Sequence, residues 1–155
     1  MSGYDSDWGR SAGAGQSHTR TVSVRHARAD RVRDVRLAPG GEWLAYTVSL
    51  SANGALNGLW VVRTDGSVNR KLDRALFGAY QWRDGNRLLI IPFSLNAANH
   101  QLWEHNAASG ASYALTEPSA TPFKIANNDW RVAPNGQAIT FVSTHDRNLW
   151  LLTLP

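Results

Sequence analysis

Cysteine is absent from this sequence of 155 residues, and lysine occurs only at Lys71 and Lys124. The lack of cysteine excludes disulfides, thiolate metal ligands and a cysteine nucleophile. No apolar run approaches the roughly 18 residues of a membrane span. Residues 1–17 are polar and Gly-rich and lack the apolar segment of a secretory signal. We therefore expect a soluble, cytoplasmic protein.

Signatures of catalysis and metal binding are also missing. There is no Gly-x-Ser-x-Gly nucleophile elbow. Ser17 and His18 are neighbours in the chain, but adjacency is not the geometry of a catalytic triad. The 5 histidines show none of the common zinc-motif spacings. We predict a protein that is not an enzyme, with no catalytic, cofactor-binding or metal-binding residues.

What the sequence does contain is an internal repeat that begins near Val32. Each of three units carries a turn with glycine and, later, a Leu-Trp pair. The glycines are Gly41, Gly85 and Gly136, and the tryptophans are Trp60, Trp103 and Trp150, 43 and 47 residues apart. Because repeat positions mainly bury a shared core, we expect these tryptophans to pack within the fold rather than bind a ligand.

Each unit has the pattern of short strands separated by turns. The turns are Ala-Pro-Gly-Gly, Arg-Asp-Gly and Ala-Pro-Asn-Gly, in which glycine supplies positive φ. Strands are expected at 43–49, 87–93 and 138–143, followed by a polar loop and the Leu-Trp strand. Outer strands should end near Leu72 and Leu115, whereas the third unit reaches Pro155 without one. No helical periodicity is evident, so helix should be scarce.

Residues 32–155 resemble the TolB-like β-propeller repeat, a relative of WD-repeat propellers. The resemblance rests on LAPGGEWLAY at 37–46, VAPNGQAITF at 132–141, and the Leu-Trp strands at 59–62 and 149–152. The sequence departs from the family pattern at Ala38 and Ala133, where serine is usual. The resemblance implies an all-β fold of three four-stranded propeller blades, half of a six-bladed propeller. It is specific for fold and weak for function.

Three blades cannot close a ring, so a three-blade wedge should leave two exposed apolar flanks. One solution is a homodimer with C2 symmetry that completes six blades. The other is that the chain is a piece of a longer propeller protein. The sequence does not decide between them.

The N-terminal part divides into a disordered tail at 1–18 and a basic arm at 19–31. Val22 and Val24 alternate with polar residues in the arm, as in a half-buried strand. We expect this strand to close a blade beside residues 148–154, donated by the same chain or by a second subunit. The arginines of the arm and just after it are predicted partner-binding residues: Arg20, Arg25, Arg28, Arg31 and Arg33.

The favoured function is a non-catalytic protein–protein interaction and assembly module that binds partners through loops at one end of the blades. The predicted loop residues are Asn53, Asn57, Asn96, Asn99, His145 and Asp146. One alternative is the N-terminal propeller fragment of a prolyl-oligopeptidase-like or other hydrolase. Another is a nucleic-acid-associated factor that acts through the arginine arm.

Overall fold

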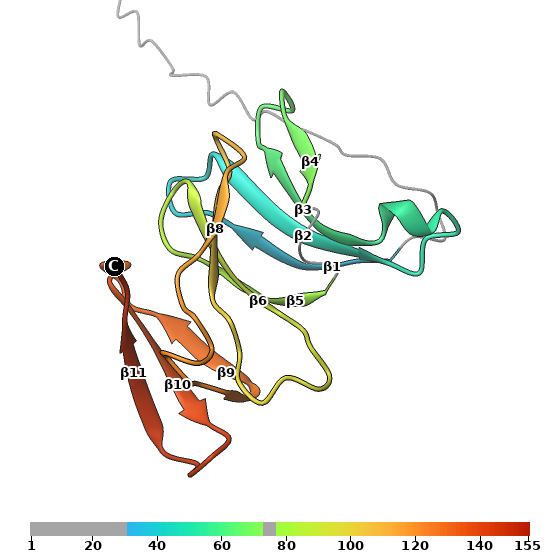
Figure 1. Cartoon of the computed structure of the whole chain (residues 1–155). Coiled ribbons are helices and arrows are strands. Elements are labelled where there is room, and N and C mark those ends of the chain that lie inside the picture. The colour runs from blue at the N-terminus through green and yellow to red at the C-terminus, as the bar shows by residue number, and fades with distance from the viewer. Residues whose placement is uncertain (1–30, 73–76) are drawn as a thin grey trace, which may run out of the picture.

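The computed structural model describes residues 31–72 and 77–155, which fold as three antiparallel sheets (Figure 1). Sheet 1 contains β1 (Arg31–Leu37), β2 (Trp43–Ser49), β3 (Gly58–Arg63) and β4 (Asn69–Lys71). Sheet 2 contains β5 (Gly78–Trp82), β6 (Arg87–Pro92), β7 (Trp103–Asn106) and β8 (Ser112–Ala114). Sheet 3 contains β9 (Ile125–Val132), β10 (Ala138–Ser143) and β11 (Leu149–Thr153). The predicted all-β class is confirmed.

Within each sheet, strands that follow one another in sequence lie side by side. The second strands match the prediction closely: β2 and β10 have the expected bounds, and β6 ends one residue early, at Pro92. The helical content of the described residues is one short 3-10 turn, η1 (Gly54–Leu56). None of the described helical structure is long or apolar enough to cross a membrane.

The first turn of sheet 2 differs from the prediction. Gly40, Gly41 and Gly136 adopt positive φ, as the turn sequences predict, but Gly85 does not. In this shorter turn the carboxylate of Asp84 accepts hydrogen bonds from the backbone N–H groups of Asn86 and Arg87, at 2.9 and 2.8 Å. A side-chain oxygen therefore organises the turn in place of a left-handed glycine.

Two apolar cores hold the three sheets together. The core between sheets 1 and 2 is centred on buried residues such as Trp43, Leu59, Val61 and Leu88. The core between sheets 2 and 3 contains Leu89, Leu102, Trp130, Ile139 and Phe141, among others. Sheet 2 thus lies between the other two, as Figure 1 shows.

The first strands of the sheets, β1, β5 and β9, are joined by hydrogen bonds from side chains to backbone carbonyls. The indole of Trp82 donates to Arg36 O at 2.8 Å, and the amide of Gln81 donates to Trp130 O at 2.6 Å. The phenol of Tyr80 donates to Asp34 O. Each bond gives a partner to a polar group that packing would otherwise leave without one.

The two outward-facing flanks differ from each other. On sheet 3, Leu149 and Leu151 are exposed. On sheet 1, Tyr46, Val48 and Val62 are buried, and the exposed apolar residues of that face are at β1. The prediction of two bare flanks is therefore confirmed for sheet 3 and wrong for most of sheet 1.

The repeated tryptophans also differ among the sheets. Trp60 stacks on Tyr46 with ring centroids 6.3 Å apart, and Trp103 packs against the core between sheets 1 and 2. Trp150 is 51% exposed. The prediction that all three tryptophans pack within the fold is therefore wrong for Trp150, because no fourth strand borders β11 in the described residues.

Candidate functional site

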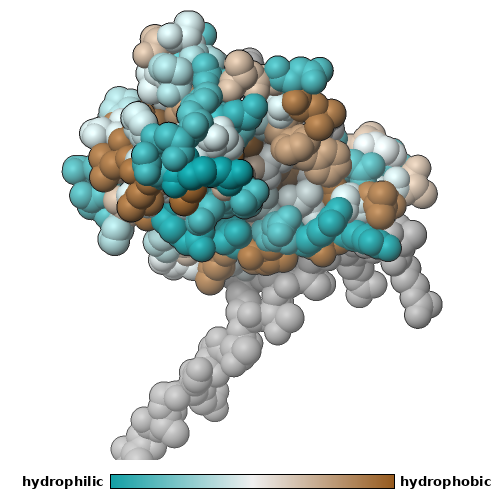
Figure 2. All heavy atoms as spheres, turned by 90° about the horizontal axis from the view of Figure 1, so that it is seen from below, coloured by the Kyte–Doolittle hydropathy of each residue, from teal (hydrophilic) through white to brown (hydrophobic). Residues whose placement is uncertain are grey.

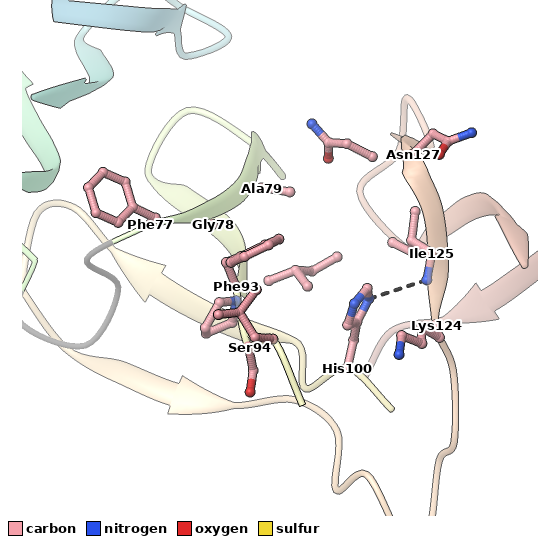
Figure 3. Close-up of a pocket in the computed structure, with 13 residues that line it drawn as sticks. Phe77, Gly78, Ala79, Phe93, Ser94, His100, Lys124, Ile125 and Asn127 are labelled. Atoms are coloured by element: carbon pink, nitrogen blue, oxygen red, sulfur yellow. Dashed lines mark hydrogen bonds between the residues drawn. The ribbon is translucent and has the colours of Figure 1, made fainter. Parts of the chain in front are cut away.

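A cavity of about 560 Å³ opens between sheets 2 and 3, at the end where β5 and β9 begin. We call it the loop-end groove. Its walls come from the start of β5, the loop after β6 and the start of β9 (Figure 3). The lining residues are Phe77–Ala79, Ile91–Leu95, His100, Lys124, Ile125, Asn127 and Asn128.

Three apolar side chains at the groove are open to solvent. Phe93 is 72% exposed and Leu95 is 84% exposed, and Phe77 is exposed as well. Figure 2, which views the molecule from below, shows hydrophobic residues at the surface among hydrophilic ones. Apolar side chains grouped around a cavity are typical of a surface that binds a partner or ligand.

The polar groups of the groove lie on its β9 side. The Nδ1 atom of His100 accepts a hydrogen bond from the N–H of Ile125 at 3.2 Å (Figure 3). Burial, and then the positive charge of Lys124, lower the pKa of His100, so the ring is neutral at neutral pH. Lys124 also lines the groove, and its Nζ donates to Ala97 O at 2.8 Å. The groove therefore pairs an apolar lining with one cation.

The backbone on this side is strained. Asn127 and Asn128 have φ of 52° and 58°, in the left-handed region that non-glycine residues rarely adopt. They lie where the pairing of β9 with β10 shifts register, between Phe141 and Ser143. Both residues belong to the groove lining, and the side-chain oxygen of Asn128 accepts a hydrogen bond from the indole of Trp130 at 2.9 Å. A second, smaller cavity of about 70 Å³ lies among β1, β5 and β9 and is lined mainly by polar residues.

A buried polar cluster in sheet 2 lies apart from the groove. Arg83 donates to the Glu104 carboxylate at 2.6 Å and to Gly136 O at 2.7 Å, and Tyr113 donates to Glu104. These bonds tie sheet 2 to sheet 3. Because they satisfy one another, the cluster has the character of a structural brace rather than a reactive site.

His105 is a buried histidine of sheet 2. Its ring is buried in β7, where Nδ1 bonds to Ser112 Oγ at 2.8 Å and Nε2 has no partner. Burial, and then Arg70, lower its pKa to about 4. The described residues contain no group of three or more His, Asp or Glu side chains placed to hold a metal ion.

The predicted partner-binding residues are spread over the molecule. Arg20, Arg25, Arg28 and the strand at 20–28 lie outside the described residues, as does the tail at 1–18. Arg31 and Arg33 are exposed on β1, and Arg33 donates to Ser49 Oγ at 2.7 Å. The roles of these arginines, nucleic-acid binding included, stay predictions.

The predicted loop residues are held in their own loops. Asn53 caps η1, and Asn57 accepts a hydrogen bond from the N–H of Ser51 at 2.9 Å. Asn96 is exposed, and Asn99 donates to Pro118 O at 3.3 Å. His145 and Asp146 are exposed in the loop before β11, where Asp146 accepts from the indole of Trp150.

The loops place these residues at the same end of their sheets as the groove, because each follows a second strand. None of them lines the groove. The groove residues that the sequence did not indicate are Phe77, Phe93, Leu95, His100 and Lys124. A signal was present: Phe93 and Leu95 are large apolar residues at the start of an otherwise polar loop.

Comparisons with known proteins place the fold. No family of proteins and no curated protein matches the chain. Among solved structures, an oligogalacturonate lyase in complex with manganese aligns with a TM-score of 0.53 and 20% identity over 90% of this chain. TolB from Acinetobacter baumannii aligns with a TM-score of 0.50 and 15% identity over 79% of this chain. The chain spans 39% and 29% of the lengths of these two structures. Both are β-propellers, so the likeness shows that the three sheets have a propeller-type fold.

Proposed function

We propose that this chain is a non-catalytic protein-interaction module of the β-propeller type, and that it binds an apolar segment of a partner protein in the loop-end groove. The observation that carries the proposal is the exposure of Phe77, Phe93 and Leu95 around one cavity. Isolated exposed apolar residues are common, but three at the mouth of a cavity form a continuous surface that association would bury.

The size and charge of the groove indicate the kind of segment. Its volume of about 560 Å³ lies within the range of ligand sites, roughly 300–1,000 Å³, and accommodates one or two large side chains. Lys124 adds a preference for a nearby carboxylate, whereas the neutral His100 adds no charge. We therefore expect a short peptide segment with an aromatic or aliphatic residue next to an acidic one.

A second candidate is that the same groove belongs to a larger propeller of which this chain forms only a part. The chain spans less than two fifths of either similar structure. These sheets would then form part of a ring whose other blades come from a second copy or from a longer protein, including one that carries a hydrolase domain. In every case the described sheets contribute binding surface.

The test is selection of peptides from a random display library against the 155-residue chain. We expect enrichment of peptides that combine an apolar and an acidic residue. Leu95→Asp should weaken their binding about ten-fold or more, equivalent to about 1.4 kcal/mol or more. Leu50→Asp, at a residue that is 63% exposed just after β2 and does not line the groove, should leave it unchanged.

Two results would contradict the proposal. One is the absence of enriched peptides, or binding that Leu95→Asp leaves intact. The other is a change in the mass of a bound peptide on incubation with the protein, because that would reveal catalysis.

A further inference from the structure

The outer edge of sheet 3 is an exposed apolar strand. In β11, Leu149 is 76% exposed and Leu151 is 63% exposed. The residue equivalent to Leu149 in sheet 1, Leu59, is 1% exposed because it lies in the core between sheets 1 and 2, so Leu149 lacks the cover of a neighbouring sheet. An edge strand with free backbone groups and large apolar side chains is a template for pairing with another strand.

The other two sheets show what normally covers this edge. In sheet 1, β4 pairs with β3, and Leu72 N–H then donates to Leu59 O at 2.8 Å. In sheet 2, β8 pairs with β7, and Leu115 N–H donates to Leu102 O at 2.8 Å. Among the described residues, sheet 3 has three strands and no equivalent of β4 or β8.

The spacing of the repeat locates a segment that fits. The connection from β4 to the first strand of the next sheet is residues 72–77, and the connection from β8 is residues 115–124. The first strand of sheet 1, β1, begins at Arg31. If the same connection lengths precede β1, a fourth strand ends between residues 20 and 24. The sequence there is Arg-Thr-Val-Ser-Val, which alternates polar and apolar residues.

The same connections also indicate which sheet residues 20–24 could pair with. Each joins the outer strand of one sheet to the first strand of the neighbouring sheet. Sheet 3 is not the neighbour of sheet 1 within one chain, because sheet 2 lies between them. A connection of this length from β1 would reach the sheet 3 of a second copy if that copy lay next to sheet 1.

We propose that residues 20–24 of one copy pair with β11 of a second copy, and that the exchange is reciprocal. Two copies related by a two-fold axis then each receive the fourth strand of sheet 3 from the other. The exposed Val32 and Leu37 of β1 lie on the side of sheet 1 that meets the neighbouring copy. This association is separate from peptide binding in the groove, so either proposal can fail alone.

The register follows from sheet 1, where Trp60 pairs with Lys71 and Val61 with Arg70. With a connection as short as 72–77, Val24 lies opposite Trp150 and Ser23 lies opposite Leu151. Residues that face each other across antiparallel strands have Cα atoms about 4.5–5.5 Å apart, within the range for a disulfide. The chain has no cysteine of its own, so an engineered pair reports this contact alone.

The experiment mixes two single-cysteine variants of the full chain, Ser23→Cys and Leu151→Cys, under mild oxidation. With a connection as long as 115–124, Thr19 lies opposite Leu151, so Thr19→Cys with Leu151→Cys tests that register. We expect one of these mixtures to give a covalent dimer of twice the 17.1 kDa chain mass. Ser67→Cys, on an exposed turn of sheet 1, is the matched control and should not link to Leu151→Cys.

Light scattering on the unmodified chain supplies a second readout. We expect a dimer, and a variant lacking residues 1–24 should be a monomer that still shows β-sheet circular dichroism. A native chain that is monomeric at all concentrations would overturn the proposal. A disulfide that forms within a single chain carrying both cysteines, without dimerisation, would show pairing in cis and overturn it too.

Discussion

The guanidinium of Arg83 lies 2.6 Å from the carboxylate of Glu104, with both side chains buried. Arg83 also donates to Gly136 O and Pro155 O, each at 2.7 Å, so one side chain connects two sheets. An arginine has five N–H donors in a planar fork, which allows this use of several acceptors at once.

Removal of the charge of Arg83 should destabilise the fold strongly. Arg83→Met leaves the buried Glu104 without its cation, and we expect a loss of about 3–5 kcal/mol in the free energy of unfolding. Urea denaturation measures it. Arg87→Met breaks the partly exposed pair with Asp84 and should cost about 1 kcal/mol or less. If the double variant Arg83→Met, Glu104→Leu is no more stable than Arg83→Met, the buried charge is not the cause.

His105 should make stability depend on pH. Its pKa in the folded protein is about 4, below the usual value of 6.5, so the unfolded chain binds the proton more tightly. Stability from this residue is present above about pH 6.5 and is lost as the pH falls toward 4, by roughly 3 kcal/mol in total. His105→Gln, which does not titrate, should flatten this part of the stability–pH curve. An unchanged slope would contradict the assignment.

Gly136 and Gly54 form a matched pair for substitution. Gly136 has a φ of +68°, and an added Cβ would lie 2.9 Å from Arg83 O, whereas Gly54 has open space around it. Gly136→Ala should destabilise by about 1–3 kcal/mol because of its left-handed backbone. Gly54→Ala should change stability by about 0.5 kcal/mol or less. Thermal melting of both variants checks the difference, and equal melting temperatures would refute it.

The phenol of Tyr80 joins sheets 1 and 2. It contacts Thr47 Oγ1 at 3.2 Å in the interior and donates to Asp34 O. Tyr80→Phe leaves Thr47 and Asp34 without this partner and should cost about 1–3 kcal/mol. In a double-mutant cycle with Thr47→Val, the double variant should lose less stability than the sum of the losses of the two single variants. Strict additivity would show that the two hydroxyls are not coupled.

The strands and turns were predictable because their causes are local. Burial alternates along Ala138–Ser143, as in a strand with one face against a core, whereas Trp43–Ser49 is an apolar strand that is buried along nearly its whole length. Pro and Gly between them set the turns. The three-sheet plan then followed from the repeat of these signals along the chain.

The buried polar residues and the groove were not predictable in the same way. Glu104 and His105 look like surface residues in the sequence, and Glu104 is buried only because Arg83 lies across from it. The groove is built from β5, β6 and β9, so Phe77 and Lys124 share it only after sheets 2 and 3 pack. The prediction for Trp150 was wrong for a different reason: the fourth strand that borders the equivalent tryptophans of sheets 1 and 2 has no counterpart beside β11 in the described residues.

The order of the strands has a consequence for how the chain is made. Sheet 1 is complete at Lys71 and sheet 2 at Ala114, and each consists of strands that pair with their neighbours in sequence. A nascent chain leaving the ribosome can therefore finish the hydrogen bonding of sheet 1 before sheet 3 has been translated. The contacts of Arg83 with Gly136 and Pro155 can form only after sheet 3 has been translated, and they connect that sheet to the two already in place.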